Sequence, residues 1–299
     1  MVCSAVLIKS AVDVWQTWQQ TEALIAQLQR EKAEAASQRI ESFVRELERQ
    51  IGWVAQPQWL KLPVEQRRFD YVRLLRQVPA ITELAQLDGD GREQLKVSRL
   101  AMDVVGSEVD RSAEPAFVKA LANRVHWGRV SYRKASEPYM TIAIAHGGRN
   151  GVTLAETNLK FVWNVIEAVK VGETGYSYIV DGNGRLIADR DISLVLRGSD
   201  LSALPQVAAA MAGGPVSDEP IDGKTFGATG PAATVSSVRA DIPTLGWRVF
   251  VDLPASETRA SLWSAVIRGT ILLVLGLVTA YLAVAVAARP STPTRRATA

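Results

Sequence analysis

The chain has 299 residues, of which 47 % are hydrophobic and 22 % are charged, and its formal net charge is +3. These totals argue against intrinsic disorder and against the strongly basic surface of a nucleic-acid-binding protein. A single cysteine, Cys3, excludes an internal disulfide framework and a cysteine-rich metal site. The length allows one large domain or two smaller ones with their own cores.

The N-terminal part of the chain predicts a long helix. Residues 16–51 contain neither Gly nor Pro, and apolar side chains recur there at helical spacing. This stripe consists of Ala33, Ala36, Ile40, Phe43, Leu47 and Ile51. We therefore predict a stalk helix over residues 20–52, with Glu41 and Arg45 paired on its outer surface.

Residues 1–19 are harder to interpret. Their short apolar patch is interrupted by Lys9 and Asp13, which makes it too short to span a bilayer and a poor signal peptide. We interpret these residues as the remnant of a first membrane anchor.

Two turns of the same kind, LDGDGRE at residues 87–93 and VDGNGRL at residues 180–186, divide the chain after the stalk. Asp-Gly and Asn-Gly supply the positive φ of a tight hairpin, and strand-like runs flank both turns. A calcium loop is disfavoured because Arg92 and Arg185 stand where a third ligand belongs.

A helix and three strand-like runs follow each hairpin. We interpret this order as an internal duplication of one module, which predicts an α+β fold with two tandem modules over residues 53–170 and 171–260. Period-two alternation places Tyr176, Tyr178 and Val180 on one face of their strand, and Ser177 and Ile179 on the other.

The C-terminal part of the chain predicts one membrane span. Residues 269–288 carry no charge, and twenty helical residues cover about 30 Å, the thickness of the hydrocarbon core. A buried core helix is the alternative, although such helices rarely lack a polar stripe. We predict a transmembrane helix over residues 263–288 and a basic tail over residues 289–299. The arginines of the tail place the C-terminus in the cytoplasm and residues 20–260 outside the cytoplasmic membrane.

No catalytic constellation is visible in the sequence. The two histidines, His126 and His146, have no cysteine near them, so a metal-ligand cluster cannot be assembled. The Gly223-Lys-Thr triplet lacks the first glycine of a phosphate-binding loop. We therefore expect neither an enzyme nor a cofactor in this chain.

The segment GYSYIVDGNGRLIADRDISLVLRGSDLSAL, residues 175–204, resembles the membrane-proximal module of the double Cache family. These are extracytoplasmic sensor domains of bacterial receptors, with two stacked PAS-like modules on one long helix. Asp189-Arg190 replaces the His-Pro pair that usually precedes Asp191 in the family. The resemblance covers residues 20–260 and implies a small-molecule sensor that forms a homodimer through the long helix.

In the family, the second membrane helix usually leads into a HAMP linker and an output domain. We see neither after residue 288 and expect the output domain to be missing from this chain. One alternative is the input half of a truncated histidine kinase or nucleotide cyclase. Another is a structural, membrane-tethered stalk that binds no ligand.

The resemblance places the ligand in the membrane-distal module, where residues 124–140 read RVHWGRVSYRKASEPYM. Trp127 and Tyr139 could supply apolar walls, and Arg133 a bidentate donor to a carboxylate. The predicted ligand is a small organic molecule, with an organic anion as the option that Arg133 suggests, and the alternative is that these side chains are core or solvated. The candidate ligand-binding residues are Trp127, Tyr132, Arg133, Glu137 and Tyr139.

Overall fold

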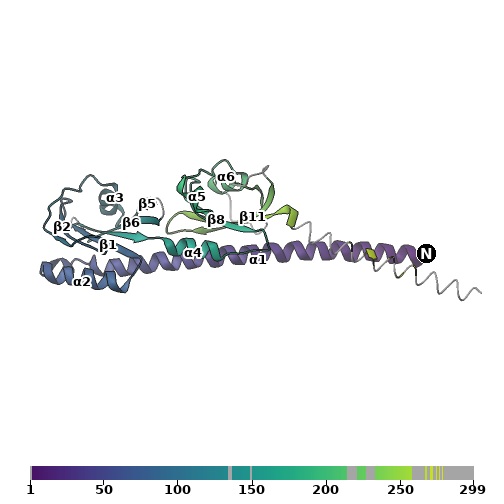
Figure 1. Cartoon of the computed structure of the whole chain (residues 1–299), viewed down its shortest axis with the longest axis horizontal. Helices are drawn as coiled ribbons and strands as arrows, with labels where there is room; N and C mark the ends of the chain where they lie inside the picture. The colour runs from purple at the N-terminus through teal and green to yellow at the C-terminus, as the bar shows by residue number, and fades with distance from the viewer. Residues whose placement is uncertain are drawn as a thin grey trace, which may run out of the picture.

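The computed structural model describes residues 2–133, 137–148, 150–213, 221–226 and 233–257, with single helical positions at 267, 270, 271, 274, 276 and 278. Helix α1 (Val2–Val54) passes along two antiparallel sheets that follow one another in the chain (Figure 1). Its 53 residues would extend about 80 Å. The predicted start at residue 20 was therefore too late, because residues 2–19 continue the same helix.

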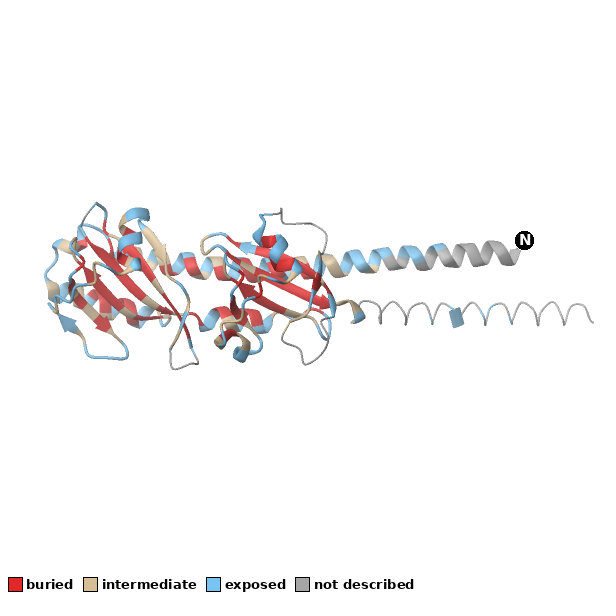
Figure 2. Ribbon diagram, turned by 90° about the horizontal axis from the view of Figure 1, so that it is seen from above, coloured by how far each residue is buried: buried red, intermediate tan, exposed pale blue. Residues whose placement is uncertain are grey.

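The predicted stripe on α1 forms its contact with both sheets. Five of its six side chains are at most 2 % exposed, and Phe43 is half-buried. Glu41 and Arg45 form the predicted ion pair at 2.7 Å, with the arginine exposed. Most described side chains in the part of α1 that precedes the sheets are exposed, as at Trp15 and Leu24 (Figure 2).

The first sheet has seven strands, and a short 3-10 helix (Trp59–Lys61) and α2 (Val64–Gln77) lead into it. Its strands are β1 (Ile81–Leu87), β2 (Glu93–Ser98), β3 (Val104–Val105), β4 (Val125–Trp127), β5 (Ser131–Arg133), β6 (Glu137–Ala145) and β7 (Val152–Asn158). Helix α3 (Pro115–Asn123) connects β3 to β4. The strand order is β3-β2-β1-β7-β6-β4, and β5 also pairs with β6.

The second sheet has five strands in the order β10-β11-β12-β8-β9. They are β8 (Tyr176–Val180), β9 (Leu186–Asp189), β10 (Ile221–Lys224), β11 (Thr234–Ile242) and β12 (Trp247–Pro254). Its helices are α4 (Lys160–Ala168), α5 (Ile192–Leu196) and α6 (Pro205–Met211). The order β9-β8-β12-β11-β10 matches the order β2-β1-β7-β6-β4 of the first sheet.

Each sheet has one face toward α1 and an outer face under short helices (Figure 1). On the first sheet, Leu84, Met140 and Ile142 belong to the core shared with α1, whereas Ala85, Leu87 and Ala143 pack under α3. On the second sheet, Tyr178, Val180 and Phe250 pack under α5 and α6, whereas Ile179 and Val249 face α1. The predicted alternation along β8 is confirmed.

Helix α4 packs against the second sheet. Trp163 donates its indole N–H to the carbonyl of Ile187 in β9 over 3.1 Å. The hydroxyl of Ser177 in β8 donates to the carbonyl of Ile166 over 2.9 Å. Helix α4, which precedes the predicted boundary at residue 171, therefore contacts the second sheet.

The predicted transmembrane helix, residues 263–288, and the basic tail, residues 289–299, lie almost entirely outside the described residues. Within the part of the chain that the structure describes, no helix is both long and apolar enough to cross a membrane.

Candidate ligand-binding site

The outer face of the first sheet changes from apolar to polar along its strands. At one end Phe117 and Ala120 of α3 cover Ala143 and Leu154. Farther along the same strands the outward positions are polar, most of them are half-buried, and no described helix covers them. This polar stretch, which we call the outer polar band, consists of Glu83, Lys96, Glu137, Tyr139, Thr141, Glu156 and Asn158.

Strand register brings the members of the outer polar band together, because directly paired residues of an antiparallel sheet point to the same face. Glu156 of β7 is paired with Glu83 of β1 on one side and with Thr141 of β6 on the other. Lys96 lies 3.1 Å from Glu83, and the hydroxyl of Thr141 donates to Glu156 over 3.5 Å. Two carboxylates directly across from each other destabilise a sheet unless a cation lies close by.

Tyr139 and Glu137 form the second part of the outer polar band. Tyr139 is only 4 % exposed, and its hydroxyl donates to Glu137 over 2.7 Å. The side-chain amide of Asn158 donates to the same carboxylate oxygen over 3.2 Å. The exposed carboxylate of Glu137 is thereby fixed at the edge of a buried aromatic ring.

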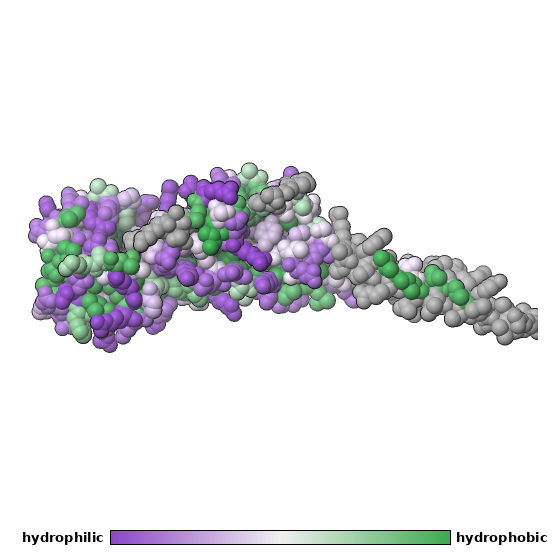
Figure 3. All heavy atoms as spheres, viewed as in Figure 1, coloured by the Kyte–Doolittle hydropathy of each residue, from purple (hydrophilic) through white to green (hydrophobic). Residues whose placement is uncertain are grey.

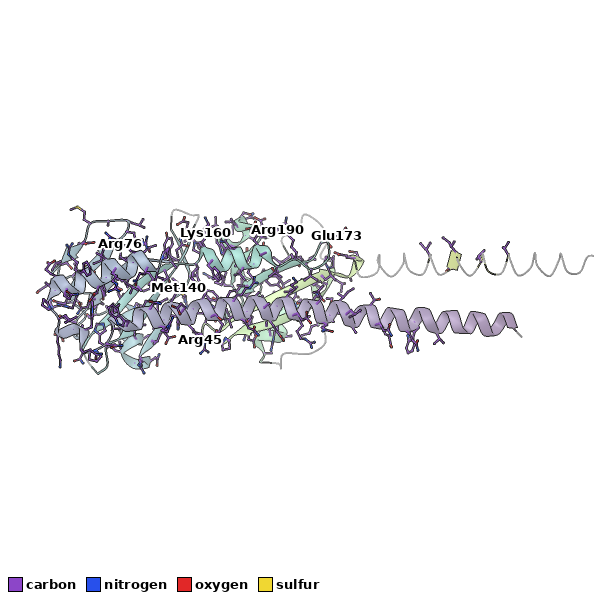
Figure 4. All side chains as sticks on the ribbon, turned by 90° about the horizontal axis from the view of Figure 1, so that it is seen from below. Arg45, Arg76, Met140, Lys160, Glu173 and Arg190 are labelled. Carbon is purple, nitrogen blue, oxygen red and sulfur yellow. The ribbon has the colours of Figure 1, made fainter. Side chains whose placement is uncertain are left out.

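The structure separates the predicted site residues into two groups. Glu137 and Tyr139 lie together on the outer face. Trp127, which is paired with Ile142, packs into the core shared with α1 (Figure 4 shows Met140 of that core beside α1). Trp127 shares the α1-facing side of the sheet with its partner Ile142, whereas Tyr139 lies on the outer face. The two rings therefore do not form the walls of one cavity.

Tyr132 lies on the same side as Trp127, toward the second sheet. It is paired with Pro138 and stacks on Trp163 of α4, with ring centroids 6.5 Å apart. Burial raises the pKa of its phenol to about 12. Arg133 ends β5, but its side chain is outside the described part of the structure, so its predicted role as an anchor stays a prediction.

A buried polar cluster lies on the outer face of the second sheet, and sequence reasoning missed it. Asp252 of β12 is fully buried beside Tyr178, under Gln206 of α6. The sequence WRVFVDLP predicts a strand here, and its alternation puts Asp252 on the same face as Phe250. That alternation could have predicted the position of Asp252, but an aspartate near a strand end is usually predicted to be exposed.

The charge of the outer polar band is acidic among its described side chains, with three carboxylates and one lysine. Its chemistry suits a group that carries positive charge and N–H donors, with Lys96 available to a carboxylate. Figure 3 shows polar residues over much of one side of both units, with apolar residues in separate patches between them.

A long helix that carries two sheets of the same strand order, each with an outer face under short helices, defines a class of sensor domain. The family model described as Cache domain matches residues 15–262, and the chain belongs to this family. A comparison with curated protein sequences gave no match.

Several solved structures share the fold. The ligand-binding domain of Mlp24 with asparagine is 13 % identical over 82 % of this chain and 98 % of that chain, with a TM-score of 0.57. That of the Campylobacter jejuni chemoreceptor Tlp3 with L-norvaline is 12 % identical over 82 % and 94 %, with a TM-score of 0.56. That of the Pseudomonas aeruginosa amino acid chemoreceptor PctC with GABA is 17 % identical over 78 % and 99 %, with a TM-score of 0.56.

Proposed function

We propose that this chain is the extracytoplasmic sensing part of a bacterial transmembrane receptor and binds a small molecule at the outer polar band. The observation that carries the proposal is the pairing of Glu83 with Glu156 on a half-buried sheet face. Lys96 lies 3.1 Å from Glu83, and the paired carboxylates offer several acceptor oxygens to the N–H donors of a bound cationic group. The fold shared with ligand-bound sensor domains supports the same conclusion.

The acidic band favours a ligand with an amino group over the simple anion predicted from the sequence. The three solved structures above hold asparagine, L-norvaline and GABA, and each of these molecules carries one ammonium and one carboxylate group. In this chain the ammonium group would lie among Glu83, Glu137 and Glu156, and a carboxylate group would reach Lys96.

We infer that each sheet with its helices is a PAS-like module and that the chain is anchored in the inner membrane through residues 263–288. We also propose a homodimer through α1. Leu24 and Leu28 are 66 % and 42 % exposed, and the exposed residues Ala35 and Ser42 follow Leu28 at intervals of seven residues. Such heptad spacing supports a helix-to-helix contact.

The chain itself has no proposed catalytic role, and its function is to change conformation when the ligand binds. Displacement along α1 would carry the signal, because α1 contacts both sheets. The structural alternative, an inert spacer, requires no ligand at all, so binding distinguishes the two.

The test is a thermal-unfolding screen of the full chain in detergent against amino acids, amines and organic acids. A ligand at a hundredfold excess over its Kd stabilises the folded state by about 2.7 kcal/mol, which raises Tm by roughly 5 °C. Glu156→Gln removes one carboxylate of the band, and Glu65→Gln, on the exposed side of α2, is the matched control. Loss of the response in Glu156→Gln but not in Glu65→Gln supports the site. An equal response in both variants contradicts it, and no response to any compound favours the spacer.

A further inference from the structure

Asp252 is the centre of a row of three polar residues on the outer face of the second sheet. It is directly paired with Ser237 of β11 on one side and with Tyr176 of β8 on the other. The side chains of such a row point to the same face. Asp252 is 0 % exposed and Ser237 is 3 % exposed, so the row is closed off from solvent.

One oxygen of the Asp252 carboxylate has a hydrogen-bond donor and the other does not. The side-chain amide of Gln206 donates to Oδ2 over 3.1 Å. The same amide nitrogen lies 2.9 Å from the carbonyl of Lys224 and 3.3 Å from the hydroxyl of Tyr178. Gln206 is held in place because its own oxygen accepts from the backbone N–H of Lys224 over 3.1 Å. It therefore cannot turn to serve Oδ1 as well.

Three buried oxygen atoms of the row are left without a hydrogen-bond partner within the described part of the chain. They are Oδ1 of Asp252, Oγ of Ser237 and the hydroxyl oxygen of Tyr176. Burial raises the pKa of the Asp252 carboxyl most strongly, and hydrogen bonding from Ser237, Gln206, Tyr178 and Tyr176 acts in the opposite direction. Buried polar atoms without a partner are rare, and each costs free energy until a ligand or water satisfies it.

No positive charge balances this carboxylate among the described residues. Arg239, two positions from Ser237 on the same face, lies 3.7 Å from Asp241 of its own strand. Burial raises the pKa of Asp252 to about 6. A carboxylate that is ionised at neutral pH and buried without a cation is costly to the folded state.

Aromatic rings stand on the same face beside the row. Tyr176 and Tyr178 have ring centroids 6.1 Å apart, and Phe226 meets Tyr178 edge-on at 4.7 Å. The ring of Phe250 stacks on the ring of Tyr178, with the two centroids 5.2 Å apart. Ring faces attract cations, most strongly where water is excluded.

We propose that Asp252, Ser237 and Tyr176 bind a small primary ammonium group. Its three N–H donors match the three oxygen atoms without partners, its charge balances the buried carboxylate, and the neighbouring tyrosine ring stabilises the cation. The site lies in the second sheet and is separate from the outer polar band, so it goes beyond the proposed function. A bound water could donate only two hydrogen bonds and would leave the charge unbalanced.

The test uses the full chain in detergent at neutral pH, with methylammonium chloride as the probe. Tetramethylammonium chloride at equal concentration carries the same charge without an N–H donor. We expect methylammonium to raise Tm by several degrees at saturation and tetramethylammonium to leave it unchanged. No rise with methylammonium, or an equal rise with both salts, would overturn the proposal.

Two substitutions locate the site. Asp252→Asn is nearly isosteric and removes a buried charge, so it should fold and lose the methylammonium response. Tyr176→Phe keeps the ring and should weaken binding roughly tenfold by removing one hydrogen bond to a charged group. The matched control is Asp222→Asn, an exposed carboxylate on the adjacent strand β10, which should respond as the unmodified chain does.

Glu156→Gln separates this inference from the proposed function. It should keep the methylammonium response, because Glu156 belongs to the first sheet. If Glu156→Gln loses the response and Asp252→Asn keeps it, methylammonium binds at the outer polar band, and the second site is wrong while the first is supported.

Discussion

The hydroxyl of Tyr139 donates a 2.7 Å hydrogen bond to Glu137, two positions earlier on the same face of β6. This contact ties an exposed carboxylate to a buried ring at one end of the outer polar band. Tyr139→Phe removes only the hydroxyl, so we expect a loss of about 1 kcal/mol in the free energy of unfolding. The loss of a fixed carboxylate should also weaken the binding of any ligand found in the thermal screen. A variant with unchanged affinity for that ligand would exclude Glu137 and Tyr139 from the site.

Tyr178 is predicted to be a main support of the second core. It is 0 % exposed and stacks on Phe250. Tyr178→Ala should lower the free energy of unfolding by about 3 to 5 kcal/mol, as other aromatic truncations in cores do. Urea unfolding of the full chain measures the change, with Phe69→Ala, on a 63 % exposed ring of α2, as the control. A change below ~0.5 kcal/mol at Tyr178 would contradict the burial of this strand.

Stability at acid pH should report the burial of Asp252. Burial raises its pKa from 3.8 to about 6, so the folded state holds the proton more tightly than the unfolded state. The resulting stability is fully present below pH 3.8 and is lost as pH rises through 6. Asp252→Asn removes this pH dependence. Its free energy of unfolding should exceed that of the unmodified chain by roughly 3 kcal/mol at neutral pH, but not at low pH. An equal difference at both pH values would contradict the assignment.

His146 should change the pH dependence of stability in the opposite direction. It is 1 % exposed, and its Nε2 lies 2.7 Å from the hydroxyl of Thr153, which also contacts the hydroxyl of Tyr71 at 3.1 Å. Burial lowers its pKa from 6.5 to about 4, so this group contributes stability above pH 6.5 that is lost as pH falls toward 4. The loss amounts to roughly 3 kcal/mol.

His146→Gln should flatten the pH profile between those values. The control is His126→Gln, on the half-exposed strand β4, which should change the profile less. If the two variants give the same profile, His146 is not the group that titrates.

The duplicated turns give a further prediction. Gly91 has φ +83°, and a Cβ there would lie 2.5 Å from the Cα of Ser112. Gly91→Ala should therefore lower the free energy of unfolding, measured by urea unfolding, by more than the roughly 1–2 kcal/mol expected for an alanine in the left-handed conformation. Gly106→Ala, at φ +63° with no atom within 4 Å of its Cβ, is the matched control for the backbone effect alone. Equal losses would show that the turn does not pack against Ser112.

Both hairpin turns were predictable from sequence because their chemistry is local. Asp88 accepts backbone N–H groups of Asp90 and Arg92 through one oxygen, and Asp181 does the same for Asn183 and Arg185. The long helix was predictable for the same reason, since a stripe at helical spacing with no breaker needs no tertiary information. The start of the helix was not predictable in this way, because residues 2–19 continue it with a different pattern of apolar and polar side chains.

The candidate site was only partly predictable, because strand register decides which residues share a face. The sequence of residues 127–133 alone gives no sign of a break between strands. The structure divides it at Gly128, whose N–H donates to the carbonyl of Thr141 over 2.8 Å. This division turns Trp127 toward α1 and leaves Tyr139 on the outer face. Period-two patterning cannot supply that pairing, nor could it show that Asp252 would be covered by Gln206 from α6.

Hydrogen–deuterium exchange of the full chain tests the central claim most directly, that a small amino-bearing ligand binds the outer polar band. The exchange is compared with and without the strongest compound from the thermal screen. We predict slower exchange in β6 and β7, residues 137–145 and 152–158, which carry Tyr139, Thr141 and Glu156. The effect should be absent in Glu156→Gln and present in Glu65→Gln. Protection confined to α1 or to the second sheet, or protection that persists in Glu156→Gln, would contradict the account.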